Sequence, residues 1–136
     1  MKLLMIYCEV FAYKPTIKTL EDFPAYHEKI ERKEVLTAFI QMEKEDESKL
    51  KYVETKLVKN LKWAAKKNDT KHIILHSFAH LSESKADPHI TKELFDLVEE
   101  RLTKSDYITE QTPFGYFLDL EVKAPGRSSA RIFKSF

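Results

Sequence analysis

One stretch of the chain, residues 72–88, reads HIILHSFAHLSESKADP and combines three local patterns. Its first five residues, with the apolar β-forming residues Ile73, Ile74 and Leu75 between two histidines, predict a strand. A polar loop follows from Ser77. Asp87 and Pro88 then predict a helix start, because Asp caps a helix amino terminus and Pro fits the first helical position. A strand that leads through a loop into a helix is typical of an α/β protein.

The sequence on both sides continues this succession of strands and helices. Leu50, Val53, Leu57 and Leu61 recur at intervals of three and four residues, which predicts an amphipathic helix. In chain order, we predict a strand at 3–11, an extended or irregular segment at 12–33, a strand at 35–42, a polar turn at 43–47, a helix at about 48–67, a strand at 72–76, a helix from 87 to about 102, strands at 107–109 and 115–122, and a basic tail at 127–136 that is a short helix or an arm. This order predicts a mixed β-sheet with two main helices packed on it, in a single domain that spans residues 1–136.

The composition excludes several classes of protein. With 43% hydrophobic and 33% charged residues, we expect an ordinary soluble protein. Lys and Arg number 23 and Asp and Glu 22, so the net charge of +1 does not indicate a nucleic-acid-binding protein. Any contact with RNA therefore depends on a local basic patch. No apolar run approaches the roughly 18–20 residues of a membrane span, so we expect no association with a membrane.

The few cysteine and glycine residues limit the compartment in which we expect the protein and the ligands that we expect it to bind. Cys8 is the only cysteine, which excludes an internal disulfide and favours a reducing compartment, the cytoplasm. Gly115 and Gly126 are the only glycines, which excludes a glycine-rich phosphate-binding loop. We expect no cofactor.

A more specific signal lies in three segments: residues 35–44 (VLTAFIQMEK), 77–84 (SFAHLSES) and 112–117 (TPFGYF). In this order and spacing they resemble the amino-terminal editing domain of archaeal threonyl-tRNA synthetase, and the similarity spans nearly the whole chain. The resemblance implies an α/β fold of the D-aminoacyl-tRNA deacylase-like type. It also implies a cytoplasmic homodimer in archaeal protein biosynthesis. Its implied partners are the aminoacylated 3′ end of tRNA and the catalytic chain of a threonyl-tRNA synthetase.

The family removes serine that has been wrongly attached to threonine tRNA. Serine lacks only one methyl group of threonine, and a missing methyl is worth about 1–3 kcal/mol, so the synthetase needs a second sieve. The resemblance implies an ester hydrolase in which backbone groups hold the amino acid. The 2′-hydroxyl of the terminal adenosine helps to position the attacking water. Oriented amide groups supply such stabilisation without a catalytic side chain.

The resemblance also implies which residues form the site. His80 lies beside the substrate, where a neutral imidazole is able to hydrogen-bond the ribose or the serine hydroxyl, and it is the one candidate for a catalytic side chain. Aromatic residues near 114–117 are candidates for stacking on the terminal adenine, although alternation along a strand sends one or two of them into the core. The implied substrate-binding residues are Ala38, Phe39, Met42, Phe78, Ala79, His80, Pro113, Phe114, Gly115, Tyr116 and Phe117.

His72, His76 and His80 recur every four residues, a spacing that on a helix favours metal binding. The local pattern here is a strand that runs into a loop, which separates His72 from His76 by about 13 Å. No carboxylate or cysteine lies near them in sequence to complete a site, so we predict no metal. Cys8 is a nucleophile only if a histidine approaches it, and a cysteine on an apolar strand more often belongs to the core.

Basic residues gather in two sets. They are Lys123, Arg127, Arg131 and Lys134 in the tail, and Lys62, Lys66 and Lys67 on the first predicted helix. The tail set is a candidate track for tRNA phosphates. A charged face is more often only solvated, so both interpretations stay open.

The chain departs from the family pattern at three places. After the PFGY string the family commonly has Tyr-Lys, whereas this chain has Phe117 and Leu118. A family glutamate near the carboxyl terminus falls at Arg131, and the first strand ends in Tyr-Cys-Glu at residues 7–9 where the family commonly has His-Ser-Asp. Two alternatives therefore stay open. One is a non-catalytic or regulatory paralogue that binds tRNA 3′ ends or a synthetase, and the other is a deacylase for D-aminoacyl-tRNA.

Overall fold

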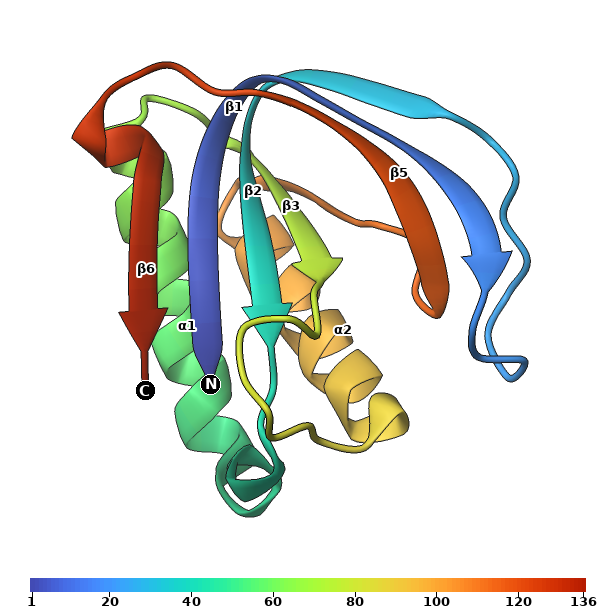
Figure 1. Ribbon diagram of the computed structural model, residues 1–136. Helices are drawn as coiled ribbons and strands as arrows, with labels where there is room; N and C mark the ends of the chain where they lie inside the picture. Colours follow the sequence, from blue (N-terminus) through green and yellow to red (C-terminus); the bar gives the residue numbers. More distant parts are fainter.

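The computed structural model describes all residues, 1–136 (Figure 1). In chain order its elements are β1 (Lys2–Lys18), β2 (Ile30–Gln41), the 3₁₀ helix η1 (Lys44–Lys49), α1 (Leu50–Lys67), β3 (His72–Ser77), α2 (Pro88–Lys104), β4 (Ile108–Gln111), β5 (Tyr116–Lys123), the 3₁₀ helix η2 (Ser128–Ala130) and β6 (Arg131–Ser135). The predicted mixed β-sheet with two main helices is confirmed.

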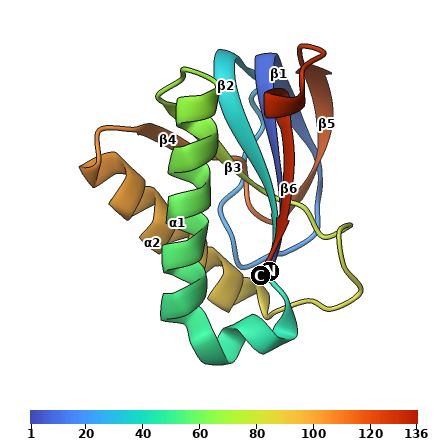
Figure 2. The same cartoon turned by 90° about the vertical axis from the view of Figure 1, so that its left-hand side faces the viewer.

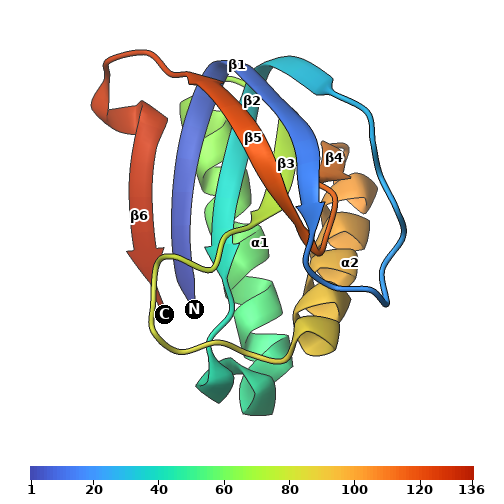
Figure 3. The ribbon, with the colours of Figure 1, turned by 45° about the vertical axis from the view of Figure 1, so that its right-hand side comes forward.

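The strands form one sheet in the order β4-β3-β2-β1-β5, and β6 also pairs with β1. β2 and β3 are parallel, as are β3 and β4, whereas β1 is antiparallel to each of its neighbours. β2 borders one edge of β1. On the other edge, β6 pairs with the first part of β1 and β5 with the second, so the two strands follow one another along it (Figure 3). β1 therefore connects every part of the sheet.

α1 and α2 lie together on one face of the sheet (Figure 2). Their apolar sides, represented by Leu57 and Leu61 of α1 and Leu94 and Val98 of α2, are fully buried in the larger hydrophobic core. The predicted start of α2 is confirmed. The carboxylate of Asp87 accepts a hydrogen bond of 2.8 Å from the backbone N–H of His89, in the first turn of the helix. This cap aims the first turn of α2 at the end of the sheet.

The opposite face of the sheet holds a second, smaller hydrophobic cluster that includes Cys8, Phe11, Phe39 and Ile74. Cys8 and Phe11 share this cluster although they are three residues apart, which simple alternation forbids. The pairing of β1 with β2 is interrupted opposite Glu34, whose φ is 55°. This irregularity changes which residues face the cluster and accompanies the curl of the sheet.

Three predicted boundaries were wrong. Residues 131–135 of the tail, predicted as part of a short helix or an arm, form strand β6, because their backbone pairs with an edge of β1. β1 extends through Pro15 to Lys18, where a register shift between Pro15 and Ile17 accommodates a residue without an N–H. β2 begins at Ile30 rather than at residue 35, since its charged first residues pair through their backbone.

Neither helix combines the length and the apolar composition that crossing a membrane requires.

Candidate active site

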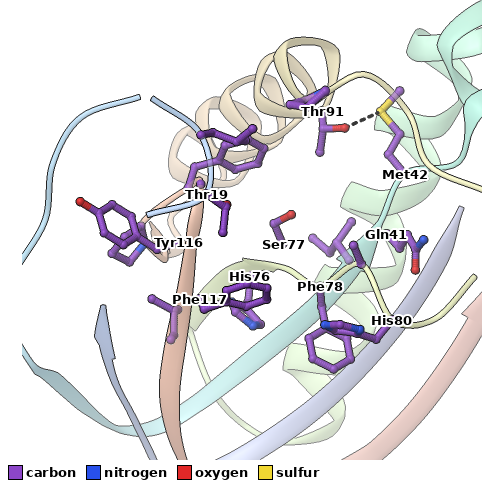
Figure 4. A pocket seen from close by; sticks show the side chains of 18 of the residues that line it. Thr19, Gln41, Met42, His76, Ser77, Phe78, His80, Thr91, Tyr116 and Phe117 are labelled. Carbon is purple, nitrogen blue, oxygen red and sulfur yellow. Dashed lines mark hydrogen bonds between the residues drawn. The ribbon is translucent and has the colours of Figure 1, made fainter. Parts of the chain in front are cut away.

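A cavity of about 470 Å³ opens where β2 and β3 end (Figure 4). Its floor comes from residues 40–42 and 76–77, and the loop after β3 lines one side. The first turn of α2, the turn between β4 and β5, and the end of β1 complete the wall. The carboxyl ends of parallel strands commonly carry ligand sites in α/β proteins.

Nine of the eleven residues predicted to bind substrate line this cavity. They come from three separate segments, at the end of β2, in the loop after β3 and at the start of β5. The nine are Met42, Phe78, Ala79, His80, Pro113, Phe114, Gly115, Tyr116 and Phe117. Their role in binding stays a prediction.

The structure does not bring the other two, Ala38 and Phe39, to the cavity surface. Ala38 is 0% exposed and belongs to the core beneath the helices. Phe39 is directed to the opposite face, where its ring meets those of His76 and Phe78, each at 5.1 Å in an edge-on arrangement. Both residues belong to the correct strand, but they precede the part of it that borders the cavity.

The loop after β3 is held by Gln41, a residue that sequence reasoning missed. Its Nε2 donates hydrogen bonds to the carbonyl oxygens of Ser82 (2.7 Å) and Ser84 (3.0 Å). Its Oε1 accepts from the N–H groups of Leu81 (2.6 Å) and Ser82 (2.7 Å). The signal was present, since a glutamine stands at the end of an otherwise apolar strand. Its four hydrogen bonds fix the cavity wall to β2.

Glu43 fastens the same loop from a second direction. Its carboxylate accepts hydrogen bonds from the Ser82 hydroxyl (2.7 Å) and from the amino group of Met1 (2.6 Å). Although burial raises the pKa of Glu43, these hydrogen bonds lower it to about 2. A carboxylate that stays ionised therefore supports the loop over the physiological pH range.

The turn between β4 and β5 depends on Gly115. Its carbonyl oxygen accepts hydrogen bonds from the N–H groups of Thr19 (2.7 Å) and Leu20 (3.3 Å). Its φ is 84°, and an added Cβ would lie 3.0 Å from the Cβ of Leu20. Only glycine meets both conditions without strain, because other residues rarely adopt this backbone conformation. Gly115 thereby joins the end of β1 to the start of β5 across the cavity.

His76 is a second residue that the sequence prediction left out of the site. It lines the cavity from the end of β3, is 6% exposed and shares a hydrogen bond of 2.9 Å with the hydroxyl of Thr112 through Nδ1. Burial lowers its pKa to about 4. The imidazole is therefore neutral at physiological pH and offers a polar group in an aromatic wall.

His80 lies in the turn after β3, exposed at the cavity, with its ring 4.9 Å from that of Phe78 (Figure 4). The backbone N–H groups of Ala79 and His80 make no hydrogen bond within the protein, and neither does the hydroxyl of Ser77. Two adjacent amide donors and one hydroxyl at a cavity are groups that a bound ester is able to use.

The three aromatic residues of the β5 region differ in their surroundings. Phe114 is 8% exposed and packs against Phe23 and Phe95. The hydroxyl of Tyr116 accepts a hydrogen bond of 3.1 Å from the backbone N–H of Tyr26. Phe117 is 55% exposed, so it is the one of the three with a ring free to stack on a base.

Of the three histidines at four-residue spacing, His76 and His80 line the cavity, whereas His72 does not. His72 binds the carboxylate of Glu110, which also holds Arg32 at 2.9 Å. This cluster lies at the β4 edge of the sheet, outside the cavity. His76 and His80 take part in the contacts described above.

Cys8 is 0% exposed and its thiol contacts the carbonyl oxygen of Ile6 at 3.5 Å and the hydroxyl of Thr37 at 3.8 Å. Burial raises the pKa of the thiol. Cys8 does not line the cavity, and a protonated buried thiol is a poor nucleophile.

The cavity wall carries one basic side chain, and it does not come from the position after Phe117. Leu118 lines the wall with an apolar side chain and packs against the smaller cluster. Lys85, from the loop after β3, is the only lysine or arginine that lines the cavity, and it is exposed and takes part in no ion pair.

The four tail residues predicted to bind tRNA lie away from the cavity and contact other parts of the protein. Lys123 lies 3.7 Å from Glu9, and Arg131 donates to the carbonyl oxygen of Pro125 at 2.8 Å. Arg127 lies over the ring of Tyr7, and Lys134 lies over the ring of Trp63 on α1. RNA binding by these residues stays a prediction.

Residues 1–136 match the family described as the archaea-specific editing domain of threonyl-tRNA synthetase. The chain belongs to this family. The predicted resemblance is confirmed, and it extends to the threonine–tRNA ligases of Thermococcus gammatolerans, at 30% identity, and Pyrococcus horikoshii, at 29%. Each alignment covers 99% of this chain and 22% of the relative, so the editing domain spans about a fifth of the length of these curated relatives.

The editing domain also resembles a solved structure, the c-Myc DNA Unwinding Element Binding Protein, with a TM-score of 0.68 at 13% identity. The match covers 100% of this chain and 99% of the other, and it concerns the fold alone. The predicted D-aminoacyl-tRNA deacylase-like fold is confirmed.

Proposed function

We propose that this editing domain is an aminoacyl-tRNA deacylase that hydrolyses the ester between L-serine and threonine tRNA. The observation that carries the proposal is the cavity itself, because it gathers residues from the segments that resemble the family and presents unpaired donors. A volume of about 470 Å³ is in the range of small-molecule sites and accommodates an amino acid with part of a ribose.

In the proposed reaction, water adds to the ester carbonyl to form a tetrahedral intermediate, which then collapses as the bond to the 3′-oxygen of the terminal adenosine breaks and serine is released. The attacking water loses a proton and the departing 3′-oxygen gains one, with the neighbouring 2′-hydroxyl as the relay. The N–H groups of Ala79 and His80 stabilise the negative charge on the tetrahedral intermediate. Preorganised donors of this kind account for about 10²–10³-fold in rate each in known hydrolases.

Side chains have positioning roles in this proposal. His80 hydrogen-bonds the ribose or the serine hydroxyl. His76, neutral because its pKa is about 4, is suited to hydrogen bonding within the wall rather than to carrying charge. Lys85 supplies the positive charge that Leu118 does not, since it is the one ammonium group on the cavity wall.

The proposed partners are the aminoacylated 3′ end of tRNA, a threonyl-tRNA synthetase catalytic chain and a second copy of this domain, in the cytoplasm. Phe133, 53% exposed, pairs with Leu4 on the sheet face without helices. β6 pairs only with β1, which leaves its other edge free. An exposed apolar face beside a free strand edge favours burial in a two-fold dimer. We also propose that residues 1–136 form a single domain.

The decisive experiment compares the single-turnover hydrolysis of seryl- and threonyl-tRNA, both made with threonine tRNA, by purified protein. We expect hydrolysis of the seryl ester and sparing of the threonyl ester. Equal rates on the two substrates would contradict selectivity for serine. No hydrolysis above background would contradict deacylase activity.

The non-catalytic alternative is favoured by one observation, the apolar Leu118 in the cavity wall. The same assay distinguishes it, because tRNA that binds without being hydrolysed identifies a binding paralogue. A D-aminoacyl-tRNA substrate, included as a third arm, tests the remaining alternative.

A further inference from the structure

The solvent face of α1 carries one sign of charge. The helix contains six lysines and a single acidic residue, Glu54, which is buried and held by Arg101 at 2.7 Å and Lys51 at 3.2 Å. The whole chain has nearly balanced charge, with 23 basic and 22 acidic residues. A solvated helix face in such a chain normally mixes both signs. The lysines of α1 are therefore segregated rather than scattered.

Two aromatic residues stand among these lysines. Tyr52 and Trp63 are 51% and 45% exposed and lie about three turns apart, so they project from the same side of the helix. Together with the intervening lysines they occupy a sector of about 100°, opposite the apolar face, over about 22 Å of helix. We call this set the lysine–aromatic stripe, and its members are Tyr52, Lys56, Lys59, Trp63, Lys66 and Lys67.

Cations surround both rings. Lys49 and Lys56 lie 5.7 and 5.9 Å from the centre of the Tyr52 ring. Lys67 and Lys134 lie 5.6 and 5.3 Å from the centre of the Trp63 ring. Lys134 comes from β6, so the stripe extends onto the edge of the sheet and joins the basic tail to α1.

The positive charge of the stripe is not neutralised within the protein. Lys56, Lys59, Lys66 and Lys67 take part in none of the ion pairs, and neither does Lys134. By contrast, Lys104 on α2 pairs with Glu100 at 2.8 Å. A surface that keeps unpaired ammonium groups beside exposed rings suits a polyanion with stackable bases or sugars.

We propose that the lysine–aromatic stripe is a second RNA-binding surface that contacts the stem of the tRNA whose 3′ end enters the cavity. This inference rests on the proposed function. α1 begins beyond the end of β2 and runs back along the sheet (Figures 1 and 2), and residues at the end of β2 line the cavity. The stem must therefore turn from the cavity mouth toward the outer face of α1, which carries the stripe. A protein partner fits the surface less well, because lysine is depleted in protein interfaces.

Trp63 is the only tryptophan of the chain, so its fluorescence reports on the stripe alone. We expect deacylated threonine tRNA to change the Trp63 emission and to protect it from quenching by acrylamide, with a midpoint equal to that of tRNA binding measured by anisotropy. Binding by anisotropy with an unchanged tryptophan signal overturns the proposal.

A matched pair of variants tests the charges. Lys59→Gln with Lys66→Gln removes two stripe lysines, whereas Lys29→Gln with Lys104→Gln removes two exposed lysines elsewhere. The salt dependence of tRNA binding should flatten by about 1.4–1.8 in logarithmic slope in the first variant, at roughly 0.7–0.9 for each lost phosphate contact. The second variant should retain the wild-type slope. Equal slopes in the two variants overturn the proposal.

A substrate without a stem separates this inference from the function on which it rests. Seryl-adenosine reaches the cavity but not the stripe, so the stripe variant should hydrolyse it at the wild-type rate and act more slowly on subsaturating seryl-tRNA. If the stripe variant hydrolyses both substrates at the wild-type rate, the deacylase proposal stands and RNA binding by the stripe is overturned. If the wild-type protein hydrolyses neither substrate, the deacylase proposal is overturned. The Trp63 fluorescence measurement then still decides whether the stripe binds tRNA.

Discussion

Gln41 and Ser82 exchange two hydrogen bonds of 2.7 Å, as paired residues of neighbouring strands do, although Gln41 contributes its side chain and Ser82 its backbone. These two hydrogen bonds attach the loop that lines the cavity to the last residue of β2. Together with the hydrogen bond from Leu81, they hold the two residues that directly follow Ala79 and His80, although the loop has no regular secondary structure.

Gln41→Leu should therefore loosen the loop, because the N–H groups of Leu81 and Ser82 lose their acceptor. We expect a loss of about 1–3 kcal/mol in the free energy of unfolding and faster amide hydrogen exchange at both positions. Denaturant unfolding and exchange measured by NMR check this. Asn60→Leu is the control, since its side chain bonds only to its own helix at Lys56. Wild-type exchange at Leu81 in the Gln41 variant would contradict the assignment.

His76 predicts a dependence of stability on pH. Burial lowers its pKa from 6.5 to about 4, so the unfolded chain binds a proton more readily than the folded one between these values. The contribution is fully present above about pH 6.5 and is lost as the pH falls toward 4, on the order of 3 kcal/mol. Urea unfolding at several pH values measures it. His76→Gln should remove this part of the pH dependence, and His80→Gln should retain it.

The proposed mechanism predicts a modest role for side chains. His80→Ala should lower the single-turnover rate on seryl-tRNA by about 10²-fold or less, the low end of general acid–base effects. Cys8→Ala should leave the rate nearly unchanged, because the thiol is buried with a raised pKa. Removal of the 2′-hydroxyl of the terminal adenosine should cost more than either. A dead His80 variant alongside a fully reactive 2′-deoxy substrate would point to a side-chain mechanism.

Gly115→Ala should distort the cavity. The added methyl would meet Leu20 at 3.0 Å, and the φ of 84° is unfavourable for alanine. Together these effects should cost about 1–3 kcal/mol in the free energy of unfolding. Thermal unfolding checks the cost, with Gly126→Ala as the control because nothing lies within 4 Å of a Cβ there. Equal melting temperatures for the two variants would show that the turn relaxes freely.

The proposed dimer depends on the sheet face around Phe133. Phe133→Asp should convert the dimer to a monomer by placing a charge on the apolar face beside Leu4. Ile108→Asp is the control, since Ile108 is 62% exposed at the other edge of the sheet. Light scattering over a wide range of concentrations measures the mass of each. A wild-type protein of one chain mass throughout would remove the dimer.

The sequence predicted the elements that bury a continuous apolar side. The helix beginning at Asp87 and Pro88 has a cap that is local in sequence, and α1 has a regular apolar spacing, so neither depends on distant residues. The extent of β1 and the existence of β6 depend on partners far along the chain. Residues 131–135, which include the basic Arg131 and Lys134, were interpreted as a tail because their strand conformation depends on backbone pairing with β1.

The site residues were predictable from sequence where short segments resemble the family. They were less predictable where contacts between distant segments determine which side chains reach the cavity. Gln41 was not singled out, and His76 was considered only as a metal ligand, because each stands in an apolar strand, where a polar residue gives no local sign of its partner. Their roles come from Ser82 and Thr112, which lie in other segments. Ala38 and Phe39 were expected at the substrate because the string was treated as a unit, yet only its end reaches the cavity.

The arrangement of β5 and β6 along one edge of β1 has a consequence for the order in which this chain folds. Lys2 meets Ser135 across 133 residues, and Thr16 meets Phe117 across 101. Contacts this distant slow folding, since the ends must find each other before the pairing stabilises them. On the ribosome, the segment from Gly115 to Leu120 emerges after both helices. The distal half of β1 has no β5 to pair with until then, and a nascent chain that stops short of that segment has no enclosed cavity to protect a substrate.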